Sequence, residues 1–220
     1  MKLRNAVLLV LATFTSLPSW ADVTSLAQSW DEITYQRDPA TREQALNALT
    51  QRAHAELTAA PDDPALLIWY GIIVSSYAGE KGGLGALSLC KEARASLELA
   101  IDHDPTALNG SAFTSLGTLY YKVPGWPIGF GSDKKAREYL SKALDLNPTG
   151  IDPNYFMGDF LVSQGEYGHA RTYLTKALNA PDRPGRAVGD AGRRGEIRAL
   201  LAKVDQKSGD GTSRSSSSGR

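Results

Sequence analysis

Apolar residues recur at every third or fourth position over most of the chain between residues 22 and 206, and prolines and glycines interrupt the runs. This spacing places apolar side chains on one face of an α-helix, whereas a half-buried strand would alternate. Aspartate precedes proline at Asp63-Pro64, Asp104-Pro105 and Asp152-Pro153. This pairing predicts helix starts with aspartate as the N-cap and proline in the first turn. The pattern therefore predicts an all-α chain of paired helices.

The stretch from residue 113 to residue 148 carries the clearest motif. Its two strings are Phe113-x2-Leu116-Gly117-x2-Tyr120 and Ala136-x3-Leu140-x2-Ala143-x4-Pro148. The alanine and leucine spacing of the second string recurs from Ala93 and from Ala170. Ala136 lies 43 residues after Ala93 and 34 residues before Ala170. A fixed period of this length indicates a helical repeat.

From Leu67 to Ala177 the chain resembles the tetratricopeptide repeat (TPR) family, whose helix pairs carry these residues with a period of 34. The resemblance implies a right-handed stack in which the first helix of each pair lines a concave face. In that family this face usually binds peptides or partner proteins. We therefore predict an all-α fold, an α-solenoid of about four TPR-like helix hairpins with a C-terminal capping helix.

The two ends of the chain differ from its middle. Lys2 and Arg4 precede an apolar run over residues 6–17, and Ser19-Trp20-Ala21 is a small-x-small cleavage site, so residues 1–21 are predicted to be a signal peptide. Residues 207–220, rich in serine and glycine, are predicted to be a disordered tail. The TPR-like domain occupies residues 22–206. Its predicted parts are repeats over 22–61, 62–105, 106–148 and 149–181 and a capping helix over 191–206.

The charge of the chain is balanced, with 24 basic and 24 acidic side chains. Removal of the signal peptide would take away two positive charges and no negative ones, so there is no basic excess to attract nucleic acid. No later apolar run reaches the roughly 18 residues of a spanning helix. These features predict a soluble periplasmic protein with no nucleic-acid partner and no insertion into the membrane.

Two of the repeats are longer than the motif requires. Gly158 lies 12 residues before Ala170, but Gly71 lies 22 residues before Ala93 and Gly117 lies 19 before Ala136. We therefore predict inserts of about ten and seven residues between the helices of repeats two and three, over 78–85 and 123–131. In a stacked solenoid the two inserts would lie side by side on one edge and form a surface.

The resemblance also implies which positions contact a partner. Carried onto repeats three and four, they are Ser111, Thr114, Thr118, Tyr121, Asp152, Tyr155 and Asp159. In the second insert, Trp126 and Phe130 lie between glycines and prolines. Trp126 either plugs the end of the helix pair with Ile128 and Phe130 or serves as a rigid aromatic anchor for a partner. The predicted partner-binding residues are Thr114, Thr118, Tyr121, Trp126, Phe130, Tyr155 and Asp159.

The residues that carry chemistry do not form a known motif. His54, His103 and His169 fall on different repeats, and neither His-x3-His nor Cys-x2-Cys spacing occurs. His103 is expected to satisfy carbonyls at a helix end. The lone Cys90 is interpreted as a buried apolar residue, against a redox or metal role. We predict no catalytic residue, no metal and no cofactor.

Two further segments allow alternative interpretations. Residues 129–134, Gly-Phe-Gly-Ser-Asp-Lys, enter a helix and could hold a phosphate, but their glycines more simply permit turns with positive φ. The second segment is basic and either forms a solvated face or fastens the capping helix to acidic residues of repeat four. Its residues are Arg183, Arg186, Arg193, Arg194 and Arg198.

The predicted function is that of an exported, non-catalytic scaffold that binds a partner protein or peptide through the first-helix face and the two inserts. The segments 123–131 and 150–156 resemble those of exported bacterial TPR proteins. The whole chain resembles more loosely the TPR-type accessory component of tripartite periplasmic (TRAP) transporters. The alternative is therefore a periplasmic solute-binding or transporter-accessory protein with a pocket under the inserts.

Overall fold

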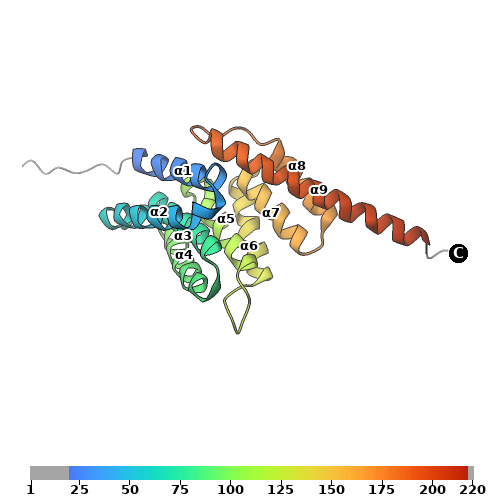
Figure 1. Cartoon of the computed structure of the whole chain (residues 1–220), viewed down its shortest axis with the longest axis horizontal. Helices are drawn as coiled ribbons and strands as arrows, with labels where there is room; N and C mark the ends of the chain where they lie inside the picture. Colours follow the sequence, from blue (N-terminus) through green and yellow to red (C-terminus); the bar gives the residue numbers. More distant parts are fainter. Residues whose placement is uncertain (1–19, 218–220) are drawn as a thin grey trace, which may run out of the picture.

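The computed structural model describes residues 20–217, and helices account for most of them (Figure 1). The helices are α1 (Trp20–Tyr35), α2 (Pro39–Ala59), α3 (Pro64–Lys81), α4 (Gly83–His103), α5 (Ala107–Lys122), α6 (Asp133–Leu146), α7 (Ile151–Ser163), α8 (Tyr167–Leu178) and α9 (Ala187–Ser217). This confirms the all-α fold and the packed helix hairpins. The predicted signal peptide lies outside the described residues, apart from Trp20 and Ala21, with which α1 begins.

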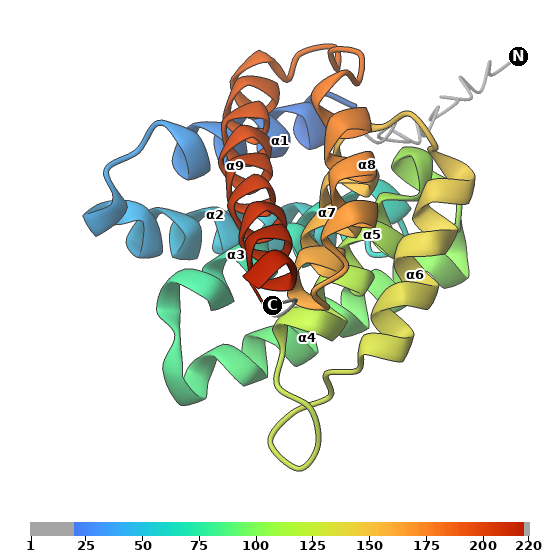
Figure 2. The same ribbon diagram turned by 90° about the vertical axis from the view of Figure 1, so that its right-hand side faces the viewer.

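The helices form two layers. Each odd-numbered helix packs against the next even-numbered one, which gives four hairpins from α1–α2 to α7–α8. The first helices α1, α3, α5 and α7 also contact one another in order, and α9 contacts both α7 and α1. Figure 2 shows α9 crossing in front of α1 beside α7. The inner layer therefore closes into a ring, which an open TPR stack does not require.

One contact recurs inside three of the hairpins. A glycine of the first helix faces a leucine of the second, in the pairs Gly71–Leu97, Gly117–Leu140 and Gly158–Leu174. A Cβ atom added to any of these glycines would lie 2.6 or 2.7 Å from the Cγ of its leucine. Alanines that flank the leucine on the second helix are fully buried. The repeated motif thus consists of the small residues that let two helices approach closely.

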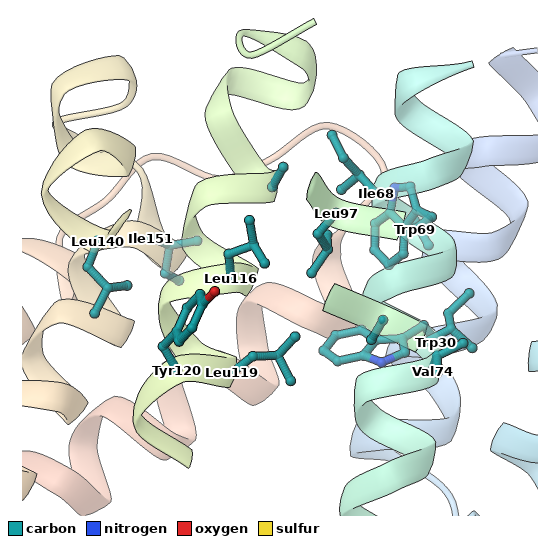
Figure 3. Close-up of a cluster of buried hydrophobic side chains, with 14 of the residues drawn as sticks. Trp30, Ile68, Trp69, Val74, Leu97, Leu116, Leu119, Tyr120, Leu140 and Ile151 are labelled. Carbon is teal, nitrogen blue, oxygen red and sulfur yellow. The ribbon is translucent and has the colours of Figure 1, made fainter. Parts of the chain in front are cut away.

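The hairpins join through one continuous apolar core. Figure 3 shows Trp30 of α1 next to Val74 of α3, and Leu97 of α4 between α3 and Leu116 of α5. Leu97 and Leu116 are fully inaccessible to solvent. Since these side chains belong to successive hairpins, each hairpin buries its apolar face only against its neighbours, as in other repeat proteins.

Of the three predicted aspartate N-caps, only the first is confirmed. Asp63 Oδ1 accepts the Ala65 N–H at 2.8 Å at the start of α3. Asp104 instead ends α4 and accepts the Thr106 N–H, and residues 108–110 take positive φ before α5 becomes regular. Asp152 lies inside the first turn of α7, after Gly150 as the N-cap, and its carboxylate forms ion pairs.

The predicted insert at 78–85 is wrong. The extra residues of repeat two lengthen α3 and α4, and only Gly82, with φ of 60°, separates the two helices. Packing between α3 and α4 outweighs the poor helix propensity of the glycines there. Residues 123–132 do form a loop, between α5 and α6. The two inserts therefore do not form a joint surface of loops.

The C-terminal helix is longer than predicted. α9 begins at Ala187, before the expected start at 191, and continues to Ser217 through most of the stretch predicted to be a disordered tail. Ile197 and Val204 are fully buried along this helix. The first turn of the helix, before residue 191, is held by contacts with α1, which is distant in sequence.

The glycine–leucine contact predicts the effect of adding one methyl group. Gly117→Ala places its Cβ against Leu140 and should lower the free energy of unfolding by about 1–3 kcal/mol through overpacking. Gly168→Ala is the matched control, because a Cβ on this exposed α8 residue meets no atom within 4 Å. Helix propensity should make the control more stable by about 0.5–1 kcal/mol. Urea unfolding measures both, and equal effects would contradict the packing argument.

Candidate functional site

The inner ring lines a partly open cavity of about 640 Å³. Its walls come from α1, α3, the beginning of α4, α5, the loop after α5, α7 and the beginning of α9, together with the segment that precedes α9. The chief lining residues are Trp30, Thr34, Trp69, Ile72, Ser76, Leu87, Cys90, Thr114, Thr118, Leu119, Val123, Ile128, Asp152, Phe156, Arg183, Arg186 and Arg193. The cavity thus lies on the first-helix face that the resemblance implied for binding.

Most of the cavity wall is apolar in character. Trp30 and Trp69 lie edge to face with ring centroids 6.2 Å apart, and the Trp30 Nε1–H donates to Ser76 Oγ at 2.8 Å. The Ser76 and Thr118 hydroxyls donate to carbonyls one turn back in their own helices, at 2.9 Å each. These polar groups already have partners, so the wall favours an apolar occupant over one that needs many hydrogen bonds.

One end of the cavity is charged. The Arg186 guanidinium forms a two-pronged ion pair with the buried carboxylate of Asp31, at 2.6 and 2.7 Å. Arg193 donates to Asp152 at 2.9 Å, and Arg183 donates to both Asp152 and Asp190. These contacts join α9 and the preceding segment to α1 and α7. The basic segment therefore fastens the capping helix to Asp152 of repeat four, which was one of the two interpretations.

Glycines of α9 allow it to approach α1 closely. A Cβ on Gly189 would lie 2.3 Å from Asp31 Oδ1, and one on Gly192 would lie 2.2 Å from Tyr35 Cγ. The Tyr35 hydroxyl donates to Glu196 at 3.3 Å. Small residues and ion pairs together therefore close the ring at the α1–α9 crossing.

At the charged end of the cavity, the surroundings keep each ionisable side chain in one protonation state near neutral pH. Burial raises the pKa of Asp152, but Arg193 and Arg183 outweigh burial and hold the pKa below its usual value. Burial, with a contribution from Glu196, raises the pKa of Tyr155 to about 12. Asp152 therefore stays ionised and Tyr155 stays protonated near neutral pH. An ionised, paired carboxylate is a poor proton donor, so this cluster suits structure better than acid–base chemistry.

The structure separates the predicted site residues into groups. Thr114 and Thr118 line the cavity. The Tyr121 hydroxyl donates to Asp159 Oδ2 at 2.8 Å, and Lys122 Nζ lies 2.7 Å from the same oxygen. Burial and the nearby Asp159 raise the pKa of Tyr121 well above its usual value. Tyr121 and Asp159 thus brace α5 against α7 rather than face an open groove.

Two other predicted residues, Tyr155 and Phe130, also make internal contacts. The Arg193 guanidinium lies 4.4 Å from the centre of the Tyr155 ring. Phe130 packs edge to face on Tyr120 at 5.5 Å, with the Arg94 guanidinium 4.5 Å from its ring centre. Phe130 therefore plugs the end of the helix pair as one interpretation had it, and Tyr155 packs where α7 meets α9.

Trp126 lies apart from the others. Its side chain is 90% exposed and that of Ile128 is 70% exposed, so the interpretation of these two residues as a plug is wrong. Gly129 and Gly131 do not take positive φ, contrary to the expectation from sequence. They allow close backbone approach instead, since a Cβ on Gly131 would lie 1.9 Å from the Val123 carbonyl oxygen.

The remaining residues that the sequence singled out lie in surroundings that favour a structural role. Burial raises the pKa of the Cys90 thiol, which is half-buried at the cavity wall and remains protonated near neutral pH. His103, the last residue of α4, places its Nε2 3.6 Å from Asp62 Oδ1. Over residues 20–217, no group of three His, Cys, Asp or Glu side chains is placed to hold a metal ion.

Comparison with solved structures supports the fold. The thermophilic TPR protein TTC0263 of Thermus thermophilus matches with a TM-score of 0.56 and 21% identity, over 84% of this chain and 83% of its own. This chain has a TPR-like fold. Two structures of MamA match this TPR-like protein with TM-scores of 0.43 and 0.44 and identities of 19% and 18%. They cover 85% and 81% of this chain and 92% and 99% of their own.

No family model and no curated protein matches the sequence. Within the described part of the chain, none of the helices has the length and apolar character needed to cross a bilayer. Sequence reasoning missed the contributions of α1 and α9 to the cavity, and its only signal for them was the cluster of arginines.

The Arg186–Asp31 contact predicts a large effect of one substitution. Arg186→Ala leaves the buried Asp31 carboxylate without its ion-pair partner and should lower the free energy of unfolding by about 3–5 kcal/mol. Arg171→Ala removes an exposed ion pair with Asp205 between α8 and α9 and should cost less than about 1 kcal/mol. Urea unfolding of both variants is the measurement. Similar small losses would show that the α1–α9 crossing does not depend on this pair.

The lowered pKa of Asp152 predicts a loss of stability in acid. Its ionised form is favoured in the folded protein, so the stabilisation is present above the unfolded pKa of about 3.9 and is lost as pH falls through the folded value. Asp152→Asn should therefore be less stable than wild type at neutral pH, and this difference should shrink below about pH 4. Urea unfolding between neutral and acid pH tests this. A difference that is constant with pH would contradict it.

Proposed function

We propose that this TPR-like protein is a non-catalytic binding scaffold that holds an apolar segment of a partner protein in its inner cavity. The proposal rests on one observation, a cavity of about 640 Å³ whose walls come mainly from the first helices of the hairpins. A cavity of this size lies within the range that proteins use for specific ligands, about 300–1,000 Å³.

The wall chemistry favours an apolar segment over a charged one. Trp30, Trp69, Ile72, Leu87 and Phe156 supply large apolar surfaces to the cavity. The arginines and carboxylates at the α9 end are already paired with one another, so a charged ligand would have to break existing ion pairs. Breaking a buried ion pair costs several kcal/mol of free energy. An apolar segment would add favourable contacts and leave the existing ion pairs intact.

A small apolar solute is the second candidate. The contact of α9 with α1 closes the ring, so the cavity is bounded on more sides than the open groove of a plain helical stack. Such enclosure suits a compact molecule as well as a protruding side chain. This candidate corresponds to the solute-binding or transporter-accessory function that the loose TRAP resemblance suggested.

Export to the periplasm belongs to the proposal as well. It is supported by the charged start, the apolar run and the cleavage site within residues 1–21. Mass spectrometry of the protein recovered from the periplasmic fraction should find an N-terminus at Asp22. Recovery of the unprocessed chain in the cytoplasmic fraction would contradict this part of the proposal.

Filling the cavity tests the proposed site. Peptides that bind the wild-type protein are selected from a random display library. The selected peptides should be rich in apolar residues. Their affinity should fall at least about tenfold for Thr118→Trp, because the new indole occupies space within the cavity. Thr172→Trp, on the exposed face of α8, is the matched control and should bind as wild type does. Binding is followed through a fluorophore attached to the peptide, because both substitutions add a tryptophan to the protein.

The neutral dye N-phenyl-1-naphthylamine separates the two candidates. If the dye binds wild type saturably, Thr118→Trp abolishes this binding and the library yields no binding peptide, the small solute is favoured. Peptides that bind Thr118→Trp as tightly as wild type would remove the cavity from the binding site and overturn the proposal.

A further inference from the structure

The loop after α5 exposes large apolar side chains at its tip. Trp126 is 90% exposed and Ile128 is 70% exposed, whereas the next most exposed large apolar side chain among the described residues is Leu99 at 43%. Figure 2 shows this loop projecting beyond the ends of the neighbouring helices. Exposing a tryptophan side chain to water costs free energy, and the packing of the helices does not require this tryptophan to be exposed.

The loop holds its tip in place through its own backbone. The N–H groups of Ile128 and Gly129 donate to the Gly125 carbonyl at 3.1 and 3.0 Å, and the Gly131 N–H donates to Pro124 at 3.0 Å. Half-buried Phe130 anchors the base of the loop against Tyr120. The tip is therefore preformed, and binding through it would not have to order the loop first.

Positive charge surrounds the base of the loop. The segment 122–135 contains three lysines and one aspartate. Lys122 is paired with Asp159, so Lys134 and Lys135 against Asp133 leave a net charge of +1. Lys134 and Lys135 lie exposed in the first turn of α6, directly after the loop. An apolar tip with lysines behind it complements a surface that is apolar inside and anionic outside.

The shape of the tip favours a lipid surface over a protein pocket. A stable protein interface buries about 1,200–2,000 Å² with many residues on each side, and a tip with two exposed large apolar residues offers far less. A bilayer accepts a few apolar side chains at the level of the headgroups, where tryptophan is enriched. Each nearby lysine adds about 1 kcal/mol of attraction to anionic lipid.

We propose that the tip of this loop, Trp126 to Ile128, docks on an anionic lipid surface, with Lys134 contacting the headgroups. The docking is peripheral and places no helix across the bilayer. Val123, Pro124 and Ile128 also line the cavity, so docking would bring this side of the cavity close to the membrane. The inference is independent of what the cavity binds.

Vesicle sedimentation tests the docking. The full chain should sediment with vesicles of phosphatidylglycerol and phosphatidylethanolamine, and only weakly with phosphatidylcholine vesicles. Trp126→Ser should weaken binding to the anionic vesicles by about tenfold or more. Lys134→Gln should weaken it about fivefold on anionic vesicles, since one lysine contributes about 1 kcal/mol, and should leave binding to phosphatidylcholine unchanged. High salt should weaken the binding of wild type.

Leu99→Ser is the matched control, because it removes an exposed apolar side chain from α4 and leaves the loop unchanged. It should bind vesicles as wild type does. All variants share one N-terminus, so differences between them report the loop and not residues 1–21. Thr118→Trp should also bind vesicles normally, which separates this test from that of the cavity. Wild type that fails to bind anionic vesicles, or binds no better than Trp126→Ser, would overturn the proposal.

Discussion

The ion pair between Arg186 and Asp31 is the contact on which the shape of the molecule depends. It joins the segment before α9 to the first helix, two parts of the chain that are 155 residues apart. An ion pair with a buried carboxylate adds little net stability by itself. It strongly disfavours, however, any arrangement in which one of the two charges is buried without its partner. The crossing of α1 and α9 is thereby specified, and with it the closure of the inner layer into a ring.

The hairpins supply the rest of the ring by a different kind of contact. Glycine against leucine, as in Gly117 and Leu140, sets how closely two helices of a hairpin lie and repeats from one hairpin to the next. These local contacts alone would build an open stack with a concave face. Closure by α9 converts that face into a cavity, and the aromatic residues of α1 and α3 become part of its wall.

The two proposed surfaces use opposite physical properties. The cavity is concave, apolar and rimmed by charges that already have partners, so it favours an apolar ligand. The loop tip is convex and apolar with an exposed Lys134 behind it, so it favours an anionic lipid surface. They meet at Ile128, which is exposed at the tip and also borders the cavity. A scaffold that binds its partner close to a membrane would use both.

The sequence alone determined the helix pairs, because the motif residues at Gly117, Ala136 and Leu140 act within a single hairpin and their spacing is readable along the chain. It also pointed to Thr114 and Thr118, which the repeat places on the inner face. Only the tertiary structure decided that residues 78–85 are helical apart from Gly82, and that the inner layer closes into a ring. The first outcome depends on packing between α3 and α4, and the second on contacts between α9 and α1, which are distant in sequence. Periodicity carries no information about either kind of contact.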